Sequence, residues 1–150
     1  MSEIIKDPQQ WLLQFDLETT IVTVGRWNTT RWSLINLHLP KDQETLSESA
    51  YSLPLMLFKD ERTDYRFNLS SRDPHLFFIF EVEEDESLKP LQVTASQTGA
   101  ASFMDGDYLV LSEPMPLPIQ AWMEAYIGRH GELLETRKKK RKGAGRASGN

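Results

Sequence analysis

The sequence contains no cysteine. Disulfide bonds, thiolate zinc sites, iron–sulfur ligation and cysteine catalysis are therefore excluded. Histidine is also scarce, with three residues at positions 38, 75 and 130. Their spacing gives neither a helical histidine pair nor a metal motif supported by carboxylates. We therefore expect no metal and no cofactor.

Signals for export, membrane insertion and catalysis are lacking as well. No apolar run approaches the roughly 20 residues that a membrane-spanning helix needs, and residues 1–10 have no basic and apolar export signal. The run GAASFMDG at 99–106 lacks the Gly-Lys-Ser/Thr ending of a phosphate loop, and no strand–turn–helix nucleophile elbow is present. These absences predict a cytoplasmic protein that is not an enzyme.

The net charge of −5 conceals a strong asymmetry. Seven of the 17 basic residues follow Thr136, which leaves 10 basic and 22 acidic residues, a net charge of −12, in residues 1–136. We predict one folded domain over 1–136 and a disordered basic tail over 137–150, since the end of the chain is low in complexity. An acidic body of this kind repels nucleic acid over most of its surface.

Segments of strand character fill most of the chain. Residues 63–69 alternate most clearly between apolar and polar side chains, which is the pattern of a half-buried strand. Residues 27–30 are predicted to form a hairpin turn, and Pro54 indicates an edge strand or a bulge because proline has no N–H to donate. Residues 108–111 are apolar throughout, as in a strand covered on both faces. The seven predicted strands are 20–26, 31–39, 51–58, 63–69, 76–82, 91–95 and 108–111.

Two or three helices complete the predicted fold. Asp7 followed by Pro8 resembles a helix start, and Ser96 is a suitable N-cap for a short helix that ends near Gly106, with Phe103 and Met104 facing the core. Pro118 fits the first turn of an amphipathic helix. Its apolar stripe comprises Ile119, Trp122, Met123, Tyr126, Ile127, His130, Leu133 and Leu134. The fold class is therefore α+β, with a curled and mostly antiparallel sheet of about seven strands that approaches a small barrel.

One cluster in the first hairpin has the composition of a binding site. It comprises Arg26, Trp27, Arg31 and Trp32, and tryptophan and arginine are enriched at interface hot spots. The alternative is that the indoles cap the core while the arginines stay solvated. Met115, between two prolines, is a further contact candidate, although methionine usually fills gaps in a core.

The basic tail is the second candidate. It holds six consecutive cations, Arg137, Lys138, Lys139, Lys140, Arg141 and Lys142. Such a run binds nucleic acid, an anionic membrane or an acidic partner, folds back on the acidic body, or serves solubility alone. No RNA- or DNA-binding motif accompanies it.

Two stretches resemble a known family. They are VTAS at 93–96 with the following small-residue helix, strand, EPMPLP turn and tryptophan-bearing helix, and VTVGR with Trp27 in the first hairpin. The sequence resembles, over roughly residues 20–142, an uncharacterised bacterial family of unknown function. Its genes are often found beside those of formate dehydrogenase, and its members are sometimes labelled accessories of molybdopterin-guanine dinucleotide biosynthesis. Arg26 stands alone where that family usually has an arginine pair.

Three functions follow as hypotheses. The first is a non-enzymatic accessory protein that binds a protein partner; the resemblance implies a subunit or maturation factor of a molybdenum-dependent formate dehydrogenase. The second is a nucleic-acid binder that acts through the tail. The third is a binding protein or enzyme for a pterin nucleotide, for which Arg26, Arg31 and Arg66 are the candidate ligands of the anionic group.

Overall fold

The computed structural model describes residues 5–104 and 106–132. In this part of the chain, six strands, three α-helices and two short 3-10 helices follow one another. The predicted tail at 137–150, together with Leu133 and Leu134, lies outside the described residues. The elements are β1 (Gln10–Val24), β2 (Trp27–His38), η1 (Gln43–Thr45), β3 (Tyr51–Met56), η2 (Lys59–Glu61), α1 (Arg62–Leu69), β4 (His75–Val82), β5 (Leu88–Thr94), α2 (Gln97–Ala101), β6 (Tyr108–Pro114) and α3 (Leu117–His130).

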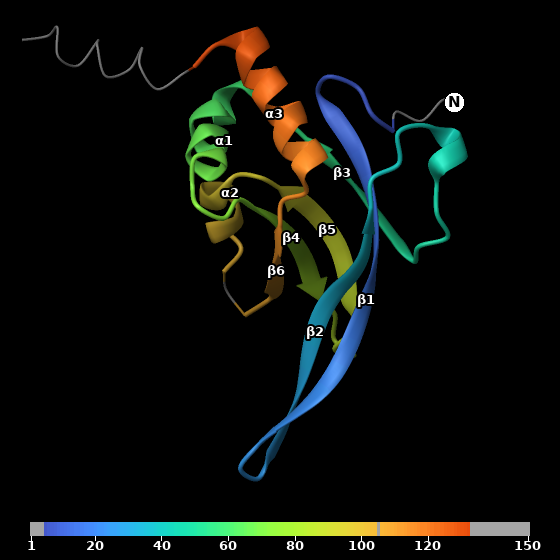
Figure 1. Ribbon diagram of the computed structural model, residues 1–150. Helices are drawn as coiled ribbons and strands as arrows, with labels where there is room; N and C mark the ends of the chain where they lie inside the picture. The colour runs from blue at the N-terminus through green and yellow to red at the C-terminus, as the bar shows by residue number, and fades with distance from the viewer. Residues whose placement is uncertain (1–4, 105, 133–150) are drawn as a thin grey trace, which may run out of the picture.

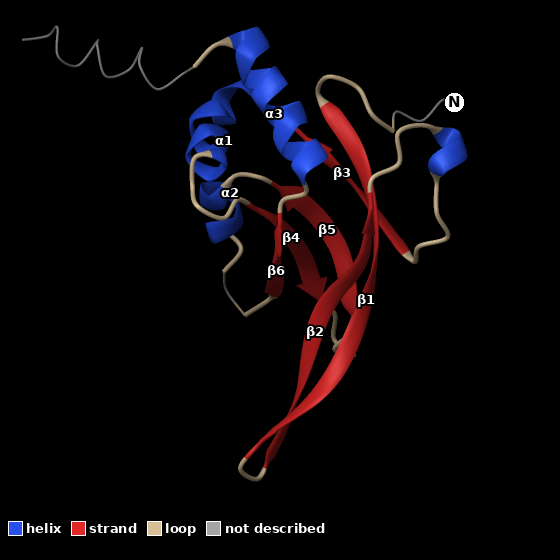
Figure 2. Ribbon diagram, in the orientation of Figure 1, coloured by secondary structure: helices blue, strands red, loops and turns tan. Residues whose placement is uncertain are grey.

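The six strands form one curled sheet in the order β2-β1-β3-β5-β4-β6. Every neighbouring pair is antiparallel except β3 and β5. The two edge strands, β2 and β6, approach each other, so that the sheet is nearly closed into a barrel. Helices α1 and α3 lie together at one end of this sheet (Figures 1 and 2). The predicted α+β class and the curled, mostly antiparallel sheet are confirmed.

The predicted N-terminal helix is wrong. Asp7 caps a turn instead, because its Oδ1 accepts hydrogen bonds from the backbone N–H groups of Gln9 and Gln10, both at 2.7 Å, and β1 begins at once. Trp11, Leu13 and Phe15 alternate along this strand and are 2%, 0% and 0% exposed. A period of two buries all three side chains on one face of a sheet, which a helix cannot do.

The strand predicted at 63–69 is also wrong, and this segment is helix α1. Tyr65 is fully buried, whereas Phe67 is 69% exposed. A strand would place these two side chains on one face, while a helix separates them and brings Tyr65 and Leu69 together. With this segment helical, the described part of the chain has six strands rather than about seven.

Strand β3 lies inside the sheet rather than at its edge. It pairs with β1 over six residues, but its pairing with β5 has a single registered partner, Leu55 opposite Val93. A side with so few ladder bonds tolerates Pro54, which has no N–H to contribute. Strand β6 is an edge strand and is half-buried along most of its length, so it is not covered on both faces as predicted.

In the second half of the chain most predicted elements agree with the structure. The strand predicted at 76–82 is β4, and it lies between β5 and β6 inside the sheet. The Ser96 hydroxyl accepts a hydrogen bond from the Gly99 N–H at 2.9 Å, which confirms the N-cap of α2. Helix α2 ends at Ala101, and Met104 beyond it is 65% exposed, so Met104 does not face the core. Helix α3 carries Pro118 in its first turn. Its buried residues are Ile119, Trp122, Met123, Tyr126 and Ile127.

Candidate functional site

The most exposed apolar residues of the sheet lie on a two-stranded ribbon formed by residues 16–35. Strand β3 pairs with β1 only from Gln10 to Phe15, and beyond that point β2 is the only strand among the described residues that pairs with β1. Figures 1 and 2 show the ribbon projecting away from the rest of the fold, at the end opposite α1 and α3. An isolated two-stranded hairpin is marginally stable in water, so this ribbon depends on the sheet at its base.

A two-residue turn ends the ribbon. Val24 pairs with Trp27, and Gly25 and Arg26 form the loop between them. Gly25 has a φ of +61°, which matches a type II′ turn with glycine at its first central position. The predicted hairpin is therefore confirmed, but the turn predicted at 27–30 is wrong, because the β-branched Thr29 and Thr30 continue the strand.

Asp16 anchors the base of the ribbon. Its Oδ1 accepts a hydrogen bond from the Ala50 N–H at 2.7 Å, and its Oδ2 accepts one from the Asn36 side chain at 3.0 Å. These two donors, the backbone of Ala50 first, hold the pKa of the Asp16 carboxyl below its usual value. The strand register shifts beside Asp16, and Asn36 has a φ of +56°. The strands thus bend at this point.

The two faces of the ribbon differ in what they contact. Residues directly opposite each other in an antiparallel pair share a face, so Trp32 shares one face with Leu34 and the other face carries Trp27 and Arg31. Leu34 is 6% exposed and Trp32 packs against the core. Trp27, by contrast, is 76% exposed. The predicted cluster is therefore divided, with Trp32 on the inward side and Arg26 in the turn.

The outward face at the end of the ribbon joins apolar and cationic groups. Val24 is 66% exposed and lies directly opposite Trp27. Arg26 lies in the turn between them, and Arg31 lies four residues along β2 from Trp27 on the same face. Both arginines are exposed, and neither forms an ion pair with another described residue. We call Val24, Arg26, Trp27 and Arg31 the tip face. It is a positively charged and apolar surface on a body whose net charge is negative.

The prediction missed Val24, and also Ile21, which is 64% exposed on the opposite face of the ribbon. The run TTIVTV at 19–24 carried the available signal. A strand with one solvated face alternates apolar and polar residues, whereas this run places β-branched side chains on both faces.

Met115 is not available for contact. It is 4% exposed within the hydrophobic core, and its N–H donates to the carbonyl oxygen of Pro74 at 2.9 Å. The prediction of Met115 as a contact residue is therefore corrected, and its thioether fills a gap in the core, as methionine commonly does.

The arginines suggested for a pterin nucleotide are not brought together. Arg66 lies on α1 at the helical end of the fold (Figure 1), where it forms ion pairs with Glu124 at 2.9 Å and Glu132 at 3.1 Å. Its hydrogen bonds to Glu124 hold the pKa of that carboxyl below its usual value. Arg66 therefore joins α1 to the middle of α3 and to Glu132 just beyond it, at the end of the fold opposite the ribbon.

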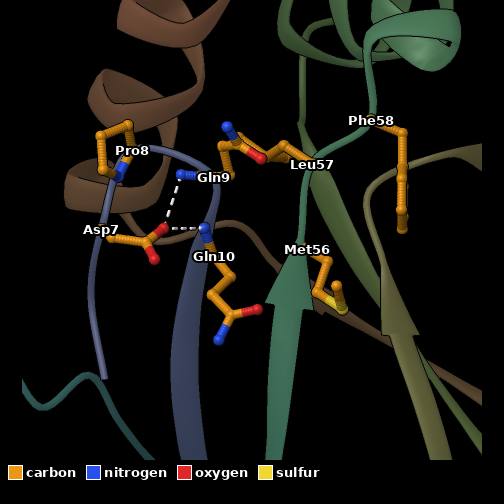
Figure 3. Close-up of a pocket in the computed structure, with 7 residues that line it drawn as sticks. All are labelled: Asp7, Pro8, Gln9, Gln10, Met56, Leu57 and Phe58. Carbon is orange, nitrogen blue, oxygen red and sulfur yellow. Dashed lines mark hydrogen bonds between the residues drawn. The ribbon is translucent and has the colours of Figure 1, made fainter. Parts of the chain in front are cut away.

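Two adjoining hollows lie near the end of β3, and their linings include a single titratable side chain. The cavity in Figure 3 has a volume of about 310 Å³ and is lined by the turn at 7–10 and by residues 56–58. Asp7 is its one titratable group, and the Asp7 carboxylate is occupied by the two backbone N–H groups shown by dashed lines. A groove of about 280 Å³ between β3 and β5 shares Met56 and Phe58 with it. Neither hollow contains an arginine.

The small residues of α2 serve packing. A Cβ added at Gly99 would lie 3.3 Å from the Ser96 hydroxyl oxygen, so there is little room for a side chain at this position.

Among residues 5–104 and 106–132, no group of three or more histidine or acidic side chains is placed to hold a metal ion. No helix in the same residues is long and apolar enough to cross a membrane.

Comparison with known proteins gives a family but no function. No curated protein and no solved structure matches the chain. A family model described as "Protein of unknown function (DUF3305)" matches residues 17–142, which include the whole ribbon from Leu17 onward and all three α-helices. The resemblance of the sequence to a family of unknown function is thereby confirmed at that level. This chain belongs to the DUF3305 family.

Proposed function

We propose that this protein is a non-enzymatic accessory protein that binds a protein partner through the tip face of its ribbon. The observation that carries the proposal is the exposure of Trp27, at 76%, directly opposite the exposed Val24. Evolved surfaces seldom leave a tryptophan in water on a projecting element, and tryptophan and arginine are the residues enriched at interface hot spots.

The tip face defines the chemistry of the partner surface. An indole and a valine side chain require an apolar depression. Two arginines that form no ion pair with another described residue require carboxylates at its rim. The hydrogen bonds of Asp16 hold the base of the ribbon, so that end is already ordered before docking, which favours binding. The expected partner is therefore a folded protein with an apolar pocket bordered by acidic residues.

For the identity of the partner we propose a subunit or maturation factor of a molybdenum-dependent formate dehydrogenase. Only the sequence resemblance supports this part, and it stands or falls separately from the tip face. The competing hypothesis is nucleic-acid binding by Arg137–Lys142, residues that lie outside the described part of the chain.

Loss of the Trp27 side chain is expected to reduce capture of the partner strongly. The tagged full-length protein is purified from its native host under anaerobic, low-salt conditions, beside Trp27→Ala and the control Phe67→Ala. Phe67 is a second exposed aromatic residue, 69% exposed on α1, so its variant controls for non-specific hydrophobic binding. The captured protein is then purified, and its Kd is expected to rise about 30-fold with Trp27→Ala, the effect of about 2 kcal/mol at a hot spot.

Other outcomes separate the hypotheses. Equal affinity of Trp27→Ala and the wild type would remove the tip face from the proposal. Recovery of nucleic acid alone, and its loss when positions 137–142 are all glutamine in the full-length chain, would instead support the tail. A partner unrelated to formate dehydrogenase that still requires Trp27 would retain the binding function and remove the maturation role.

A further inference from the structure

The ribbon also has an open backbone edge, which the tip face does not use. From Asp16 to Val24 one side of β1 pairs with β2, and no strand in the described part of the chain pairs with the other side. This free edge exposes backbone N–H and C=O groups. Exposed edges are usually blunted by proline, lysine or a bulge, but residues 17–24 contain neither proline nor lysine and their register with β2 is continuous.

The charges along this edge are arranged from acid to base. Asp16 and Glu18 stand at one end, Arg26 stands at the other, and residues 19–25 are uncharged. An antiparallel neighbour with the same sequence would place its basic end beside the acidic end of this strand. A parallel neighbour would place like charges together. The edge of β1 is thus complementary to itself in the antiparallel direction.

We propose that two copies of this chain pair antiparallel along the free edges of β1, centred on Val22. Thr20 then lies opposite Val24 of the second copy and Val22 lies opposite itself, so that Glu18 lies beside the turn that carries Arg26 of the second copy. The two ribbons become one four-stranded sheet with a two-fold axis at Val22, the self-complementary contact of a cyclic dimer. Each dimer contains the Glu18–Arg26 pair twice.

The charge pattern favours β1 over the outer edge of β2. Arg26 and Arg31 flank the start of β2, with no acidic residue among positions 26–35. Self-pairing there brings cations together, and like charges directly opposite each other destabilise a sheet. The dimer leaves Trp27 and Arg31 of the tip face free, because their side chains project from the plane of the ribbon and not from its edge. Arg26 belongs to both surfaces, so the dimer is tested separately from the proposed function by exchanging the charges of Glu18 and Arg26, which leaves Trp27 in place.

The first test reverses the charges of the pair. The mass of the full-length protein in solution is measured by sedimentation equilibrium over a range of concentrations, with circular dichroism to verify folding. Glu18→Arg and Arg26→Glu are each expected to weaken the dimer at least about tenfold, since each creates two like-charge contacts. The double variant restores both contacts and the dimer. Lys89→Glu, an exposed charge reversal on β5, is the matched control and leaves the dimer unchanged.

Mixing gives a more stringent result. A Glu18→Arg chain and an Arg26→Glu chain have two opposite-charge contacts with each other and none with themselves, so the mixture is expected to form heterodimers although each variant alone is monomeric. A wild-type monomer at all concentrations, or a double variant and a mixture that both remain monomeric, would overturn the proposal.

The absence of cysteine permits a second, independent test. Position 22 meets its own copy across the two-fold axis, and paired positions in adjacent strands lie within the Cα separation that a disulfide spans. Val22→Cys is therefore expected to form a covalent dimer under mild oxidation. Val82→Cys, a 38% exposed valine on β4, should remain monomeric. Equal cross-linking of both variants would contradict the proposed register.

Discussion

Replacing Tyr65 with alanine is expected to lower the free energy of unfolding by about 3–5 kcal/mol, the range for aromatic side chains removed from a core. Tyr65 is fully buried on α1, and its ring meets that of Tyr126 on α3 at 6.5 Å between centroids. Its hydroxyl donates to Glu61 at 2.7 Å and accepts from the Phe58 N–H at 2.9 Å. Removal of the side chain therefore leaves both a cavity and a backbone N–H without its partner.

Phe67→Ala is the matched control and tests the helix itself. Phe67 is two residues away and 69% exposed, so its loss should change the free energy of unfolding by no more than about 0.5 kcal/mol, as is usual at the surface. Urea denaturation of both variants provides the measurement. An equally large decrease in the free energy of unfolding for both variants would indicate that Tyr65 and Phe67 share a buried face, as they would in a strand. That result would contradict helix α1.

Asn68→Ala is expected to lower the free energy of unfolding by about 2–3 kcal/mol, because its side chain makes three hydrogen bonds and each contributes about 1 kcal/mol. The backbone groups that it bonds would lose their partners. The Asn68 side chain donates to the carbonyl oxygens of His75 at 2.8 Å and Ala95 at 2.9 Å, and it accepts from the His75 N–H at 3.0 Å. One 8% exposed amide thus ties the end of α1 to β4 and to the end of β5. No pattern in the sequence marks it.

Asn68→Asp separates the donor from the acceptor role. Aspartate retains an oxygen for the His75 N–H but directs a carboxylate at two carbonyl oxygens, so at neutral pH we expect a loss at least as large as that of alanine. Asn28→Ala is the control, since Asn28 is exposed and its side chain accepts one hydrogen bond, from Thr23 at the end of the ribbon. The free energies of unfolding are measured by thermal or urea denaturation. An equal loss in Asn28→Ala and Asn68→Ala would contradict the role of Asn68 in joining α1 to β4 and β5.

Elements whose local signals agree with one another could be predicted from sequence alone. The apolar run of β4, the Ser96 cap of α2 and the proline-led stripe of α3 all appear where their patterns placed them. Each depends on residues near in sequence: a cap bonds to an N–H three residues away, and a stripe repeats within two turns. The ribbon was predictable for the same reason, although its turn lies at residues 25–26 and not at 27–30.

Tertiary structure decided the segments whose local signals allowed two solutions. Asp7-Pro8 begins a helix as readily as it forms a turn, and here the Trp122 indole donates to the Asp7 carbonyl oxygen at 2.8 Å and fixes the turn. Likewise the Ser96 hydroxyl donates to the carboxylate of Asp64 on α1 at 2.8 Å, a contact between residues 32 positions apart. Hydrogen bonds between residues so far apart in the sequence cannot be predicted from a short stretch of it.

The candidate site shows the same division. Composition alone marked Arg26, Trp27, Arg31 and Trp32 as unusual, but it did not separate the tryptophan that packs from the one that is exposed. That separation follows from strand register, since Trp27 and Trp32 are five residues apart and an odd spacing places side chains on opposite faces. Which face turns toward the core depends on how the sheet curls over Leu34, and the curl arises only when all six strands and the helices pack together.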